Sequence, residues 1–144
     1  MRFSTHSIVA AKQLCESTGQ NAEVQIWTDG STSPNPGPAG AGAVVVLPEQ
    51  DHKSCMRAAL GQASNNAAEL WAIGMALEFA FATFPGVPVN VFSDSSFAIG
   101  VLQKGHFCAR YHFMAHAIRN MVHTTGRAVR WHHVYSHVGI PLNE

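Results

Sequence analysis

The sequence has few charged residues and few cysteines, and each shortage excludes a class of protein. Only 12% of its 144 residues are charged and 47% are hydrophobic, which excludes a disordered chain and predicts one domain with a substantial core. The three cysteines (Cys15, Cys55 and Cys108) include no CxxC pair, so they indicate neither a disulfide framework nor a zinc ribbon and favour an intracellular setting. No apolar run is long enough to span a membrane.

Acidic residues are also missing from the start of the chain. Residues 1–15 contain Arg2 and Lys12 but no acid, a balance found in transit peptides. A linker, or the remainder of a longer parent chain, explains this balance equally well. We therefore expect residues 1–21 to be an N-terminal extension or linker and residues 22–144 to be the domain. The expected location is the nucleus or cytoplasm, with mitochondrial targeting left open.

The C-terminal part of the chain is basic although the net charge is zero. From Gly100 onward Glu144 is the only acid, against five lysines and arginines and seven of the nine histidines. A basic half beside an acidic half is expected for a phosphate-binding face next to a metal-binding cluster, but chance also produces such asymmetry in a short chain. His112, His116 and His123 share a helix face at a spacing that also suits zinc. Because no metalloprotease glutamate accompanies them, a solvated or phosphate-facing helix is favoured.

Hydrophobic periodicity predicts an α/β fold. Alternating and β-branched segments predict strands, and apolar residues at helical spacing predict helices, of which the first has Asn65 or Asn66 as its N-cap. The predicted strands are residues 23–29, 39–48, 54–60, 87–94 and 127–136, and the predicted helices are residues 64–86, 95–103 and about 110–123. A helix between the third and fourth strands must cross over the sheet, so the first and fourth strands are expected to pair in parallel.

This pairing brings together three acids that are distant in the sequence. Asp29 and Asp94 then end adjacent strands at the same edge, and Glu69, in the first turn of the crossover helix, leans toward them. Singly, the two aspartates are ordinary strand-end turn residues, and the glutamate is an acid favoured by the helix dipole. Together, three carboxylates stay ionised only around a cation, and hard oxygen ligands suit Mg²⁺ or Mn²⁺. Such a site serves phosphoryl chemistry, in which two metals stabilise the attacking and leaving oxygens.

Four segments resemble the signature blocks of type 1 ribonuclease H, in the same order and in matching structural context. They are "TDGS…NPGPAGAG", "NNAAELWAI", "FSDSSFAI" and "VYSHVGIPLNE", and the resemblance covers roughly residues 22–144. It implies the ribonuclease H-like fold, with a five-stranded mixed sheet in the order 3-2-1-4-5 and helices on both faces. It also implies that the chain cuts the RNA strand of an RNA–DNA hybrid with the help of two divalent metal ions, Mg²⁺ or Mn²⁺.

The resemblance assigns roles to individual residues. It implies that Asp29 bridges both metals and that Glu69 and Asp94 each hold one of them. His137, on the loop after the last strand, would help proton transfer or product departure. The positions that it matches to substrate contacts are Asn35, Ser64, Asn65, Asn66 and Ser95.

The family pattern continues beyond Asn143-Glu144 with a fourth carboxylate and a helix that packs on the sheet. The domain is therefore expected to be C-terminally incomplete, to lack its final helix and to have weakened activity. A parent polyprotein, such as the reverse transcriptase of a retroelement, is the expected source. The alternative function is a catalytically degenerate ribonuclease H-like domain that binds nucleic acid or acts as a scaffold.

Overall fold

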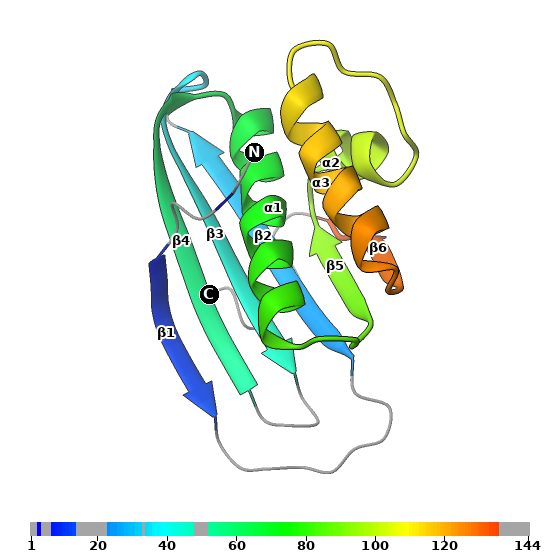
Figure 1. The fold of residues 1–144 in the computed structure, drawn as a ribbon. Helices are drawn as coiled ribbons and strands as arrows, with labels where there is room; N and C mark the ends of the chain where they lie inside the picture. The colour runs from blue at the N-terminus through cyan, green and yellow to red at the C-terminus, as the bar shows by residue number, and fades with distance from the viewer. Residues whose placement is uncertain (1–2, 4–6, 14–22, 33, 48–51, 136–144) are drawn as a thin grey trace.

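Six strands and three helices make up the part of the chain that this computed structural model describes, which comprises residues 3, 7–13, 23–32, 34–47 and 52–135 (Figure 1). The strands are β1 (Ser7–Gln13), β2 (Val24–Thr32), β3 (Gly37–Leu47), β4 (His52–Ala63), β5 (Val89–Ser93) and β6 (Val129–His133). The helices are α1 (Asn65–Thr83), α2 (Ser96–Leu102) and α3 (His112–Thr125).

The strands form one mixed sheet in the order β1-β4-β3-β2-β5-β6. β2, β3 and β4 are an antiparallel meander, whereas β5 runs parallel to both β2 and β6. The run β4-β3-β2-β5-β6 confirms the predicted order of five strands, 3-2-1-4-5. It also confirms the parallel pairing that the crossover helix requires, since α1 connects β4 to β5.

The sheet has one strand more than the sequence predicts. β1 lies within residues 1–21, the segment expected to be an extension or linker, and pairs antiparallel with β4 at the edge of the sheet. An edge strand leaves backbone N–H and C=O groups unpaired, so part of the extension gains hydrogen bonds by joining β4. The short run of β1 has no periodicity strong enough to predict it from sequence.

The three described helices contact one another and cover the same face of the sheet (Figure 1). α1 packs on β2, β3 and β4, and the core between them contains Ile26, Val45, Leu70 and Val91, all fully buried. None of the helices in the described residues is both long and apolar enough to cross a membrane.

The other face carries no helix within the described residues, although helices are expected on both faces. Three rings line up there across β2, β5 and β6. The Trp27 ring stacks on Phe92 with centroids 4.1 Å apart, and the Phe92 ring stacks on His132 at 4.6 Å. The segment that follows residue 135 lies outside the described part of the chain.

Phe3 anchors the start of the chain on α1. Its side chain is 1% exposed, its ring meets Trp71 edge-on at 4.9 Å, and its N–H donates to Glu78 Oε2 at 3.1 Å. The ring lies directly on Gly74, where an added Cβ would come within 2.5 Å of it. Only glycine leaves room on the helix for this aromatic ring.

Arg127, in the segment before β6, binds the C-terminal end of α1. Its guanidinium donates to the carbonyl oxygens of Phe84 at 2.7 Å and Phe81 at 3.3 Å, and it lies over the Phe81 ring at 4.7 Å. The last carbonyls of a helix have no partner within the helix, so a cation that binds them stabilises the helix end.

Candidate metal centre and nucleic-acid interface

Two of the three acids are placed by the parallel pair β2 and β5. Trp27 pairs with Phe92, and Asp29 and Asp94 each lie two residues further along their strands' direction. The end of β5 is held from its other side, because His133 Nε2 hydrogen-bonds the Asp94 carbonyl oxygen at 3.2 Å. The two carboxylates therefore leave the sheet at the same edge, as the sequence predicts.

Glu69 reaches the aspartates because α1 lies very close to β2. A Cβ added to Gly30 would lie 2.5 Å from the backbone nitrogen of Glu69 and 2.5 Å from the carbonyl carbon of Ala68. Only a glycine permits this approach of helix and strand. Asp29, Glu69 and Asp94 then present one carboxylate oxygen each, all within 4.8 Å of one another.

Glu69 has an unusual environment for an acid. It is 8% exposed, and its Oε2 atom has no hydrogen-bond partner. Burial first, and then the negative charges of Asp94 and Asp29, raise the pKa of the Glu69 carboxyl to about 8, against a weaker lowering by a hydrogen bond from the Gly30 backbone. Without a cation, this carboxyl holds a proton at neutral pH.

These residues fit a hard divalent cation. Three carboxylates, one of them with an unpartnered buried oxygen, supply the oxygen ligands that Mg²⁺ and Mn²⁺ prefer. A cation would also displace the proton from Glu69 and offset the negative charges of Asp94 and Asp29 that help to raise its pKa. Asp29, Glu69 and Asp94 are the residues that would hold it.

Several of the predicted substrate-binding residues lie beside one another at the start of α1. Asn35 Oδ1 accepts the Asn65 N–H at 3.0 Å, and the Thr32 hydroxyl donates to Asn65 Oδ1 at 3.0 Å. These bonds tie the β2–β3 turn to the helix. Asn66 is exposed next to them.

Ser64, and not Asn65 or Asn66, is the N-cap of α1. Its Oγ accepts the Ala67 N–H at 3.2 Å and also hydrogen-bonds the Tyr111 hydroxyl. The predicted cap is wrong because Ser64 accepts the free N–H of the first turn, while the Asn65 side chain is bonded to Thr32 at the end of β2. The contact with Tyr111 joins the start of α1 to the start of α3, and sequence alone has no signal for it.

Ser95 lies at a separate place, just before α2. Ser95 caps α2, since its Oγ accepts the Ala98 N–H at 3.0 Å, so its position after Asp94 has a structural use as well as the predicted substrate role. His137 lies outside the described residues.

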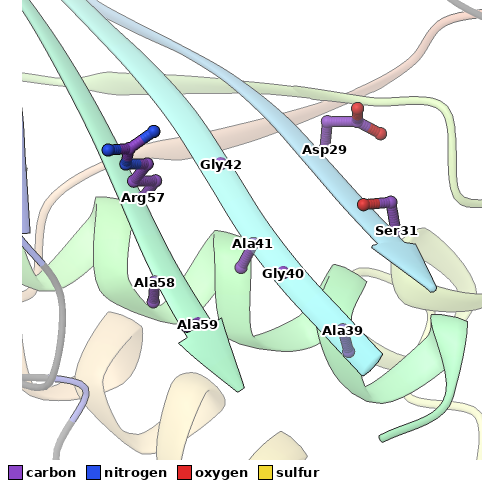
Figure 2. A pocket seen from close by; sticks show the side chains of 9 residues that line it. All are labelled: Asp29, Ser31, Ala39, Gly40, Ala41, Gly42, Arg57, Ala58 and Ala59. Atoms are coloured by element: carbon purple, nitrogen blue, oxygen red, sulfur yellow. The ribbon is translucent and has the colours of Figure 1, made fainter. Parts of the chain in front are cut away.

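An open cavity of about 650 Å³ adjoins Asp29 on the sheet face away from α1 (Figure 2). Gly42 pairs with Asp29 on one side and with Arg57 on the other, so these three residues form one line across β2, β3 and β4. Figure 2 shows the Asp29 and Arg57 side chains on the same side of the sheet, with only the glycine between them. Sequence reasoning missed Arg57, because its place depends on the β-strand register.

A family model described as RNase H matches residues 21–144. The chain belongs to the RNase H family. Among its curated relatives is Ribonuclease H of Syntrophomonas wolfei, 39% identical over 83 residues, which are 58% of this chain and 54% of that protein. The chain thus spans about half the length of this relative.

Solved structures of RNase H proteins share the fold. RNase H1 from Halobacterium salinarum is 27% identical, with a TM-score of 0.65 and coverage of 78% of this chain and 86% of that chain. LC11-RNase H1, isolated from compost, was solved in complex with an RNA/DNA hybrid. It is 25% identical, with a TM-score of 0.67 and coverage of 78% of this chain and 85% of that chain.

Proposed function

We propose that this RNase H family chain hydrolyses the RNA strand of RNA–DNA hybrids at a divalent-metal site formed by Asp29, Glu69 and Asp94. The observation that carries the proposal is the convergence of these carboxylates within 4.8 Å, with a buried Glu69 oxygen that lacks a partner. The likeness to LC11-RNase H1, which was solved with an RNA/DNA hybrid, supports the choice of substrate.

The three acids divide the work of holding the metal. Asp29 would be shared between two Mg²⁺ or Mn²⁺ ions, and Glu69 and Asp94 would each hold one of them. Such ions, when bound, stabilise the attacking and leaving oxygens of an in-line displacement and supply the nucleophile from water. The low exposure of Glu69 excludes bulk water from one side of the site.

The residues around the acids orient the nucleic acid. Asn35 and Asn65 hold each other in place at the edge of the site, which favours their predicted contacts with the RNA strand. Arg57 supplies a cation beside Asp29 that would attract a phosphate group. A role of His137 in proton transfer or product departure remains part of the proposal.

The test is cleavage of an end-labelled RNA–DNA hybrid in Mg²⁺ or Mn²⁺, with protein in excess so that a weak activity is detected in a single turnover. Cleavage of the RNA strand alone is expected, and Asp94→Asn should reduce it to background. Glu23→Gln is the matched control, because Glu23, just before β2, is a half-buried acid that pairs with Arg130 and is not one of the three clustered acids.

Two results would overturn the proposal. One is a folded protein that cleaves no hybrid with either ion, and the other is an Asp94→Asn variant as fast as the parent chain. Tight binding of the hybrid without cleavage would favour the degenerate nucleic-acid-binding domain instead.

A further inference from the structure

Two large aromatic side chains near the start of α3 are almost fully exposed. Phe107 and Phe113 are each 81% exposed, and both contact the His112 ring, with centroid distances of 6.3 and 5.7 Å. We call Phe107, His112 and Phe113 the aromatic platform. Exposed apolar rings that gather at one place indicate an interaction site more often than rings that occur singly.

The surroundings of the aromatic platform are basic. Lys104 and Arg110 are exposed in the same connection between α2 and α3, and no acid occurs between residues 95 and 143. Glu78 of α1, which lines a cavity together with Phe113, already binds the Phe3 N–H. Positive charge around aromatic rings favours an anionic ligand that also has apolar faces.

The two residues before His112 line a second cavity, beside the start of α1. This cavity, of about 390 Å³, is lined by Ser64, Ala67, Arg110 and Tyr111, among others. Ser64 and Tyr111 hydrogen-bond across it, and the Arg110 guanidinium lies 5.8 Å from the Tyr111 ring. Asp29 and Glu69 do not line this cavity. The start of α1 therefore separates the cavity from the metal centre.

We propose that the aromatic platform stacks unpaired bases of single-stranded DNA that extends from the DNA strand of a bound hybrid. This inference rests on the proposed function, in which the RNA strand occupies the metal centre, so the strand on the other side of the α1 start is DNA. Bases inside a duplex already stack on one another, whereas unpaired bases have free faces for aromatic rings. Base–aromatic stacking together with a basic groove is the usual way to hold single strands without sequence preference.

The test is binding of the full chain in EDTA, where no cleavage occurs, to fluorescein-labelled hybrids measured by anisotropy. The hybrids are blunt or carry a four-nucleotide DNA extension at either the 5′ or the 3′ end of the DNA strand. One of the two extensions should tighten binding about fivefold or more, the gain expected from stacking one base.

Two controls separate stacking from charge and from general disturbance. An extension of abasic nucleotides keeps the phosphates without the bases and should give no such gain. The double variant Phe107→Ala/Phe113→Ala should lose the gain but keep the affinity for the blunt hybrid. Tyr135→Ala, which removes an aromatic ring of matching exposure (79%), should keep both.

The aromatic platform is refuted if the blunt hybrid binds and neither extension improves binding. It is also refuted if the abasic extension gives the full gain, or if the gain survives in a folded double variant. A chain that binds no blunt hybrid would instead contradict the proposed function. In that case the aromatic platform is tested with free single-stranded DNA. Binding by the parent chain that is lost in the double variant supports the aromatic platform, and no binding by the parent chain refutes it.

Discussion

Replacing Glu69 by glutamine tests whether burial and the two neighbouring aspartates raise the pKa of this carboxyl in the folded chain. Glutamine resembles the protonated carboxyl but cannot ionise. In the parent chain without metal, the pKa of Glu69 rises from 4.5 to about 8 because the side chain is buried and lies beside Asp94 and Asp29. The folded chain therefore keeps a proton that the unfolded chain releases between these two pH values.

This difference fixes the sign and the size of the expected effect. Below about pH 4.5 the Glu69 carboxyl is protonated in both states, so the parent chain has the full stability that this group allows. From there to about pH 8 its free energy of unfolding falls, by up to about 1.4 kcal/mol per pH unit from this one group. Glu69→Gln should be similar to the parent at pH 5 and clearly more stable at pH 8.

The assay is urea unfolding followed by circular dichroism in EDTA from pH 5 to 9, with the difference between the two proteins plotted against pH. Mg²⁺ should narrow this difference at pH 8, since it stabilises the parent by about 2.7 kcal/mol at a hundred times its dissociation constant and the variant by less. Glu23→Gln controls for the loss of an acid elsewhere. A difference that does not change with pH would refute the reasoning about Glu69.

Three further predictions concern stability, each measured as the free energy of unfolding in urea. Gly42→Ala should stabilise the protein by about 0.4–1 kcal/mol, because the added Cβ would meet only carbonyl oxygens at 3.8 and 3.9 Å. Gly30→Ala should destabilise the protein strongly, because the added Cβ would lie 2.5 Å from the backbone of α1. Equal effects at the two glycines would contradict this. Arg127→Met should cost about 1–3 kcal/mol by leaving helix-end carbonyls unpaired, and an unchanged midpoint would show that water replaces the guanidinium. Phe3→Ala should cost about 3 kcal/mol, against less than about 0.5 kcal/mol for the exposed Phe107→Ala, and similar costs would show that Phe3 is not part of the core.

The sequence predicts the sheet order well because its elements have clear periodicity. The long apolar helix α1 crosses the sheet, so the strand after it must lie parallel to the first predicted strand. This requirement leaves few possible topologies. Asp29 and Asp94 follow from that pairing alone, and Glu69 follows from its place in the first turn of α1. The roles of these acids, and the reverse transcriptase origin, remain predictions.

What the sequence could not predict depends on contacts between elements. The closeness of Gly30 to Ala68 is a tertiary contact, and a glycine after an aspartate predicts an ordinary turn equally well. The choice of Ser64 as the cap goes with the contact between the Asn65 side chain and Thr32, which lies in another element. β1 is an edge strand that pairs only with β4, so it forms through a contact with another element. Its own residues contain little sequence signal for a strand.

The position of Asp94 directly after a strand that pairs with β2 has a consequence for the protein during its synthesis. A growing chain that has emerged only as far as α1 contains two of the acids, but neither β5 nor the third acid, which follows β5. The ion site cannot form before β5 has left the ribosome and found its place beside β2. The proposed nuclease would thus not cleave nucleic acid near the translating ribosome until most of the domain has been synthesised.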